Sequence, residues 1–144
     1  MQTMVSTYVN GIDEAIKLYQ KAFDAKLGYT MPSEESDCKY YHAELDIYGL
    51  NLALAEAKYV LNFYDSLTEE GVKVFSQTQR IAGNTMQICI YFDKGDGDKI
   101  RQAYAVLRDG SVALVELGAA LGSACMVDFI DKFGIRWVLI ESVE

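Results

Sequence analysis

The chain has 144 residues, of which 51% are hydrophobic and 24% charged, a composition typical of a folded domain with its own hydrophobic core. Its formal net charge is −8, and its lysines and arginines form no cluster. Nucleic acid and anionic membrane surfaces are therefore poor candidates as partners.

The sequence also indicates the cellular compartment of the protein. The first residues carry no basic leader, and no apolar run reaches the roughly 20 residues that span a bilayer, so we expect neither a targeting segment nor a membrane span. The three cysteines, Cys38, Cys89 and Cys125, are widely spaced and form no CxxC pair. This pattern favours a reducing cytoplasm.

The first half of the chain predicts a strand, a helix and three more strands. Met4–Val9 is the first strand, and Asn10 is the expected N-cap of the helix. The helix presents one apolar stripe at helical spacing, made of Ile12, Ala15, Ile16, Tyr19, Ala22 and Phe23. The further strands are predicted at Leu27–Met31, Lys39–Tyr48 and Leu50–Ala55, after a polar turn at 32–37.

The stretch 57–84 is predicted to connect two halves. Within it, Leu67–Gly71 has the composition of a helical turn and Val72–Phe75 that of a short strand.

After this connection the same order of elements recurs. Thr85–Phe92 alternates like a strand, and a helix follows with the stripe Ile100, Ala103, Tyr104 and Leu107, capped by Asp96 or Asp98 and ended by Asp109-Gly110. Three strands are predicted at Ser111–Glu116, Cys125–Ile130 and Ile135–Ile140, with Gly118 and Gly122 in a loop. The fold class is thus α+β: two tandem βαβββ modules, about 1–56 and 85–144 of one domain, forming a cupped mixed sheet with the helices on its outer face.

The alternation within the strands also predicts a cavity. The apolar strand faces should pack on the helices, which leaves the mixed faces to line the inside of the cup. A bulge of one residue in any strand would reverse its assignment. The side chains placed around a common cavity in this way are Thr7, Tyr40, His42, Glu44, Gln87, Cys89, Tyr91, Arg136 and Val138.

At this point the chain resembles a known family, the vicinal oxygen chelate superfamily of glyoxalase I, extradiol dioxygenases and bleomycin and fosfomycin resistance proteins. More narrowly, it looks like the PhnB-like branch. The segments that carry the resemblance are Tyr8–Gly11, Leu18–Phe23, His42-Ala43-Glu44-Leu45, Gly83-Asn84-Thr85 and Asp131-Lys132-Phe133-Gly134-Ile135-Arg136-Trp137. The resemblance implies cupped sheets of two βαβββ modules, a homodimer, and a small-molecule site.

Enzymes of this superfamily hold a divalent metal with four side chains on the first and fourth strands of each module. Laid on this sequence, those positions fall near Val5, Leu52, Gln87 and Val138. Valine and leucine offer no oxygen, nitrogen or sulfur ligand, and a slip of one residue supplies no carboxylate or imidazole set. We therefore predict no metal site and no cofactor.

Six residues are predicted to contact a ligand: Tyr40, His42, Glu44, Gln87, Tyr91 and Arg136. His42, the only histidine, is either a base or binding group oriented by Glu44 or a half-buried structural residue. Arg136 either holds an acidic ligand or pairs with Glu44 or Asp128. Gln87 would donate or accept hydrogen bonds from the wall, and the tyrosines would stack on a flat ligand.

Paired-carboxylate chemistry is not expected, because Glu56 should lie beyond its strand and face solvent. Cys89 lacks a basic neighbour and is not expected to be a nucleophile. Gly95-Asp96-Gly97 is expected to be a turn into the helix.

No catalytic residue can be named. The sequence predicts a metal-free small-molecule-binding protein. Its alternatives are a divalent-metal lyase, isomerase or dioxygenase with other ligands, and a structural dimer whose cup is filled.

Overall fold

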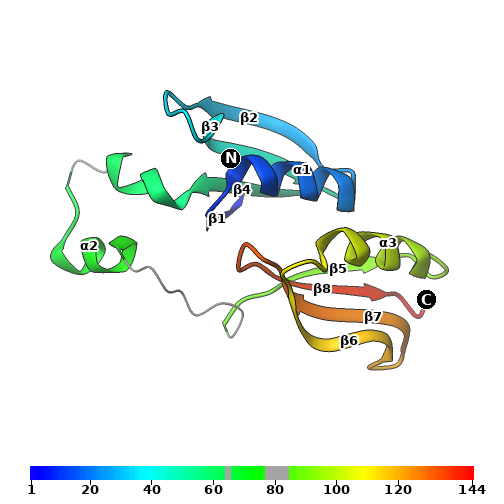
Figure 1. The fold of residues 1–144 in the computed structure, drawn as a ribbon. Helices are drawn as coiled ribbons and strands as arrows, with labels where there is room; N and C mark the ends of the chain where they lie inside the picture. Colours follow the sequence, from blue (N-terminus) through cyan, green and yellow to red (C-terminus); the bar gives the residue numbers. More distant parts are fainter. Residues whose placement is uncertain (64–65, 77–84) are drawn as a thin grey trace. The chain divides into compact units, whose positions relative to one another are not determined.

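The computed structural model describes residues 1–63, 66–76 and 85–144, and the chain divides into two compact units, Met1–Arg80 and Ile81–Glu144. Each unit contains the predicted order of one strand, one helix and three strands (Figure 1). The boundary between the units falls inside the stretch 57–84 that the sequence marks as the connection.

The first unit is a four-stranded mixed sheet with one helix on it. Its elements are β1 (Val5–Val9), α1 (Ile12–Phe23), β2 (Lys26–Pro32), β3 (Tyr40–Ile47) and β4 (Leu50–Glu56). The strand order is β1-β4-β3-β2, with β1 parallel to β4 and the other pairs antiparallel. A 3-10 helix, η1 (Ala57–Phe63), and a helix, α2 (Glu69–Ser76), follow.

The second unit repeats this plan. It contains β5 (Ile88–Phe92), α3 (Gly97–Leu107), β6 (Val112–Ala120), β7 (Ser123–Ile130) and β8 (Arg136–Glu141). The strand order β5-β8-β7-β6 has the same pairing pattern as the first sheet, with only β5 and β8 parallel. The α+β class and the two βαβββ modules predicted from the sequence are confirmed.

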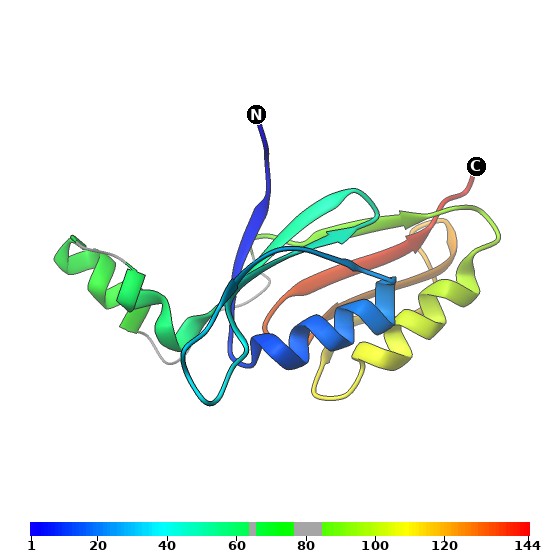
Figure 2. The ribbon, with the colours of Figure 1, turned by 90° about the horizontal axis from the view of Figure 1, so that it is seen from above.

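The predicted apolar stripe of α1 forms the core of the first unit. Ile12 and Tyr19 are fully buried, and α1 contacts β3 and β4, where Leu45, Leu52 and Leu54 are equally buried. Figure 2 shows α1 running along its own sheet. Each leucine buried in this way stabilises the fold by roughly 1.5–3 kcal/mol.

The core of the second unit lies between α3 and its sheet. Ile100 and Leu107 of α3 are buried, as are Phe129 and Trp137 of the sheet. Tyr104 meets Phe129 edge to face, with ring centroids 4.9 Å apart. Edge-to-face geometry is favourable for aromatic rings.

Four local predictions are wrong. Neither Asn10 nor Asp96 caps its helix with a side chain. The predicted strand at 72–75 lies in α2, and Gly118 lies within β6 rather than in a loop. Among the described residues, no helix is both long and apolar enough to cross a membrane.

Candidate functional site

A cavity of about 380 Å³ opens in the first unit, between the sheet and η1. Small residues of β1 and β4, including Ser6, Ala53 and Ala55, form part of its wall. The larger side chains that line it include Tyr8, Tyr29, Met31, Tyr41, His42 and Phe63. This volume lies in the range of pockets that bind small organic molecules.

Two neighbouring residues of β3, Tyr41 and His42, both line the cavity. In a regular strand they would point to opposite faces. The pairing with β2 explains the exception: Met31 pairs with His42 and Pro32 pairs with Tyr40, so β3 carries one extra residue, Tyr41. A bulge of this kind locally breaks the alternation of side chains.

Aromatic contacts hold the wall of the cavity in place. The ring of Tyr41 meets Phe63 at 5.0 Å and Tyr59 at 5.8 Å between centroids, both edge to face. The ring of Tyr29 lies 6.0 Å from that of His42. Since Val60 and Phe63 of η1 line the cavity and Tyr59 of the same helix contacts Tyr41, this helix and the bulged end of β3 form one side of the cavity together.

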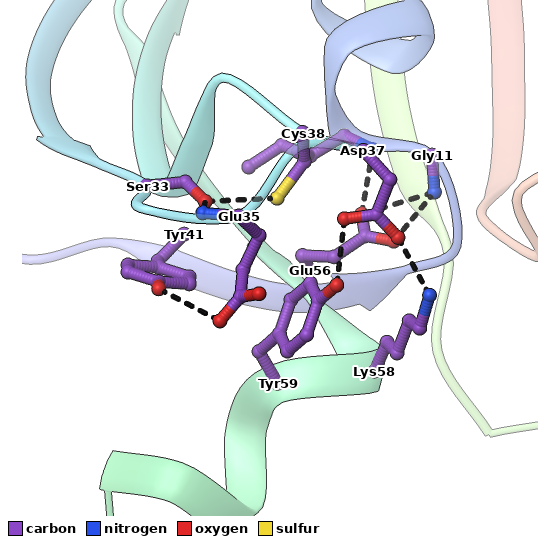
Figure 3. A network of polar contacts seen from close by, with 10 residues as sticks. Gly11, Ser33, Glu35, Asp37, Cys38, Tyr41, Glu56, Lys58 and Tyr59 are labelled. Carbon is purple, nitrogen blue, oxygen red and sulfur yellow. Dashed lines mark hydrogen bonds and ion pairs between the residues drawn. The ribbon is translucent and has the colours of Figure 1, made fainter.

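Polar contacts attach the loop before β3 to η1 (Figure 3). The carboxylate of Asp37 accepts hydrogen bonds from the hydroxyl of Tyr59 and the ammonium of Lys58, each at 2.6 Å. These bonds, that from Lys58 first, hold the pKa of Asp37 below its ordinary value. The same carboxylate raises the pKa of Tyr59 to about 12, because it favours the protonated hydroxyl.

Tyr59→Phe tests this attachment. The substitution removes one of the two donors to Asp37, so the pKa of Asp37 should move up, and the tyrosine that stays protonated until about pH 12 should be missing. Carbon-detected NMR titration of the carboxyl groups and of the phenol rings measures both. Tyr40→Phe is the matched control and should leave both values unchanged. An Asp37 pKa that does not move in Tyr59→Phe would contradict the contact.

A second polar cluster lies beside the cavity, on the face of the sheet away from α1. His42 Nε2 is 3.3 Å from Glu44 Oε2, the contact that the sequence predicts. The other oxygen of Glu44 accepts hydrogen bonds from Asn51 Nδ2 at 2.9 Å and Gln2 Nε2 at 3.4 Å. The bonds from Asn51 and, next, from His42 lower the pKa of Glu44, so this carboxylate is ionised at neutral pH.

The six predicted ligand residues are distributed over both units. His42 lines the cavity, and Glu44 lies directly behind it; Tyr40, one position before the bulge, does not line this cavity. Gln87 and Tyr91 are exposed residues of the second unit, in or next to β5. Whether they share a site with His42 stays a prediction.

Arg136 forms the ion pair that the sequence offers as one alternative. Its Nε and Nη2 donate to the two oxygens of Asp128 at 2.8 and 2.6 Å, in a bidentate arrangement between β8 and β7. The Asp128 side chain is 9% exposed. The structural pairing of Arg136 is confirmed, and its role toward a ligand stays a prediction.

The expectation that Glu56 faces solvent is wrong. Glu56 is the last residue of β4 and is buried. Its carboxylate accepts hydrogen bonds from the backbone N–H groups of Gly11, at 3.0 and 3.1 Å, and of Ile12, at 2.8 Å. Glu56, at the end of β4, thereby caps the N-terminus of α1 from more than forty residues away in the sequence. Local sequence patterns do not reveal such a role.

Sequence reasoning missed most of the cavity wall. Tyr8, Tyr29 and Phe63 lie on β1, β2 and η1, and none stands in a chemically distinctive motif. The available signal was the pair of aromatic residues Tyr59 and Phe63, which a solvent-exposed connection would not require.

The residues at the superfamily's metal positions do not fit a divalent ion. Val5 pairs with Leu52 across β1 and β4, and Leu52 is fully buried in the core beside α1. Neither side chain has a donor atom. Within the ranges that the structure describes, no three or more His, Cys, Asp or Glu side chains gather where they could hold a metal.

Comparisons with known proteins support the fold. No family model and no curated protein matches the sequence. Solved structures do match: a putative 3-demethylubiquinone-9 3-methyltransferase, PhnB protein, from Bacillus cereus is 16% identical over 99% of this chain and 100% of that chain, with a TM-score of 0.70. The fosfomycin resistance protein FosX from Listeria monocytogenes is 14% identical over 99% of this chain and 93% of that one, with a TM-score of 0.60.

These matches define the class of the fold. The chain shares its fold with the PhnB protein from Bacillus cereus and with FosX, as the resemblance implies. The likeness to the PhnB protein extends over nearly the whole of both chains.

Proposed function

We propose that this chain binds a small organic molecule in the cavity of its first unit, without a resident divalent metal. The observation that supports the proposal most is the cavity of about 380 Å³ itself, walled by four aromatic rings, a methionine and the only histidine of the chain. Such a combination of apolar surface with few polar groups is typical of ligand sites. Among the predicted ligand residues we place His42 in contact with the ligand, supported by Glu44.

The metal-free part of the proposal concerns the chemistry that the site can perform. One matching structure, a mutant of FosX from Listeria monocytogenes, holds Mn(II) and 1S,2S-dihydroxypropylphosphonic acid. A corresponding metal enzyme needs oxygen, nitrogen or sulfur ligands, and Val5 and Leu52 supply none. Without a ligand set, fold alone does not assign that reaction to this chain.

Two further expectations belong to the same proposal. The thiols of Cys38, Cys89 and Cys125 are unpaired, which suits a reducing cytoplasm. We also expect a homodimer, as in the family that the chain resembles. Sedimentation equilibrium of the purified chain measures that state directly.

The ligand-binding proposal is tested by filling the cavity. Ala55 lines it, so Ala55→Phe should take up much of its volume and reduce binding by tenfold or more. Equilibrium dialysis of the wild-type chain against a metabolite panel identifies a retained compound, and the variant is then compared with it. The matched control is Ala105→Phe on the exposed side of α3, which should bind normally.

Two results would contradict the proposal. The first is a panel from which the wild-type chain retains nothing. The second is equal retention by the wild-type chain and by Ala55→Phe. The metal-free part has its own test: after chelation and reloading with zinc, nickel, manganese or iron, elemental analysis should find less than one ion per chain.

A further inference from the structure

The histidine in the cavity wall has one ring nitrogen already engaged. The His42 side chain is 27% exposed, lines the cavity, and places Nε2 3.3 Å from Glu44 Oε2. The side chain of Glu44 is 12% exposed and lies outside the lining of the cavity. The carboxylate thus reaches the ligand only through the imidazole ring.

The protonation of this pair follows from what surrounds Glu44. Asn51 and Gln2 donate to its Oε1, and these amide donors favour the ionised carboxylate. An ionised carboxylate can only accept hydrogen bonds, so the contact requires that His42 Nε2 carries the proton. In the neutral imidazole the other nitrogen, Nδ1, is then an acceptor.

The charged residues of the cavity wall further restrict which class of ligand can bind. Among the residues that the structure describes, no lysine or arginine lines the cavity. Within the described part of the lining, the one acidic residue is Glu56, and its carboxylate already accepts hydrogen bonds from the backbone N–H groups of Gly11 and Ile12. A carboxylate or phosphonate buried here would meet no lysine or arginine among the described lining residues, and burying an unpaired charge is costly.

We propose that His42 and Glu44 form a hydrogen-bond-accepting dyad that selects ligands with a flat apolar body and an uncharged hydroxyl or amino donor, and that disfavours anions. His42 Nδ1 accepts the hydrogen bond of the ligand. Glu44 is a positioning residue, since it fixes the proton on Nε2 and does not itself meet the ligand. This inference rests on the proposed function of the cavity.

Three compounds with the same ring system test the selection. 2-Naphthol carries a donor, 2-methoxynaphthalene lacks it, and 2-naphthoate carries a negative charge at neutral pH. The expected order of affinity is naphthol, then methoxynaphthalene, then naphthoate. Naphthol should bind about tenfold more tightly than its methyl ether, a ratio that one net hydrogen bond supplies. Titration calorimetry at neutral pH measures each binding constant.

Substitutions of His42 and Glu44 test whether these two residues cause the preference for naphthol over its methyl ether. His42→Phe keeps a ring of similar size without an acceptor, so the ratio of naphthol to methoxynaphthalene affinities should fall close to one while the ether still binds. His42→Gln restores an acceptor oxygen and should recover part of the ratio. Glu44→Gln should lower the ratio by about threefold, because a neutral amide fixes the Nε2 proton less strongly. The matched control, Glu116→Gln, changes an exposed glutamate of the second unit and should leave the ratio unchanged.

A spectroscopic readout separates positioning from a merely structural role of Glu44. The chain has one histidine, so its ring nitrogens give unambiguous NMR signals. In the wild-type chain the neutral ring should carry its proton on Nε2, and Glu44→Gln should increase the share of the Nδ1-protonated form. A fold that is intact by circular dichroism with an unchanged tautomer would overturn the role of Glu44.

The outcomes also distinguish this inference from the proposed function. Equal affinities for naphthol and its ether, or an unchanged ratio in His42→Phe, would overturn the dyad and leave the cavity as a ligand site. No binding of any of the three compounds, up to their solubility limits, would overturn both. Tighter binding of naphthoate than of naphthol would overturn the inferred disfavour of anions.

Discussion

Replacing Glu56 by alanine is expected to lower the free energy of unfolding of the first unit by about 3 kcal/mol, since buried groups that lose a charged hydrogen-bond partner cost about 1–3 kcal/mol each. The substitution leaves the N–H groups of Gly11 and Ile12 without their acceptor at a helix start that is packed against β4. It also removes a negative charge from the positive end of α1. Thermal unfolding followed by far-ultraviolet circular dichroism measures the loss.

Gly11 makes this helix start unusually dependent on Glu56. Gly11 has φ of 98°, a left-handed conformation in which it offers its N–H to the carboxylate and no side chain to the helix. Amide hydrogen exchange at Gly11 and Ile12 should therefore accelerate in Glu56→Ala. Glu34→Ala, at an exposed position of the same unit, is the control and should change stability by less than about 0.5 kcal/mol. A Glu56→Ala chain as stable as this control would show that the cap contributes nothing.

The second module contains a counterpart of this cap. Glu141, the last residue of β8, accepts a hydrogen bond from the N–H of Gly95 at 2.7 Å, just before α3. Glu141 comes 141 − 56 = 85 residues after Glu56. The first residue of α3, Gly97, likewise comes 97 − 12 = 85 residues after the first residue of α1, Ile12. The duplication that periodicity reveals in the strands thus extends to a contact between the last strand and the helix of each module.

Periodicity predicted the regular elements because burial enforces it. The stripes Ile12–Phe23 and Ile100–Leu107 and the alternation of Lys39–Tyr48 match helices and strands of the structure, since each presents one face to a core. The prediction failed at Val72–Phe75, where four residues fit a strand or one turn of a helix equally well. There the helix α2 formed, with Glu69 and Glu70 in its first turn and Lys73 near its end.

The cavity was less predictable because it depends on contacts between elements. The placement of Tyr41 beside His42 follows from one extra residue in β3, and bulges leave no reliable local signal. Val60 and Phe63 reach the cavity wall because η1 lies against the end of β3, where Tyr59 contacts Tyr41 and donates to Asp37. His42 and Glu44 were predictable together, because residues two apart in a strand share a face.

The segment Asp131–Trp137 is one of those that carry the family resemblance, and the structure shows what its residues do. Asp131 is 4% exposed and begins the turn between β7 and β8. Its Oδ1 accepts hydrogen bonds from the backbone N–H groups of Phe133, at 2.9 Å, and Ile135, at 3.0 Å. Its Oδ2 accepts a hydrogen bond from Trp137 Nε1 at 2.9 Å. One carboxylate thus sets both the turn and the orientation of the buried indole.

Asp131→Ala is therefore expected to be the most destabilising substitution in the second unit, with a loss of about 4 kcal/mol in the free energy of unfolding, because it leaves three N–H groups without this acceptor. Asp131→Asn should lose about half as much: its one oxygen can still accept from the turn, but its NH₂ then faces the indole N–H, and two donors repel. Trp137 is the only tryptophan and is fully buried, so its fluorescence reports this unit alone. The emission of Trp137 should shift to longer wavelength and the midpoint of denaturant unfolding should fall. Both changes should be largest in Asp131→Ala and smaller in Asp131→Asn, relative to the wild type.

Asp109→Asn, at an exposed turn, is the control and should unfold like the wild type. If Asp131→Asn and Asp109→Asn have equal midpoints of denaturant unfolding, the hydrogen bond between the carboxylate and the indole does not contribute to the stability of this unit.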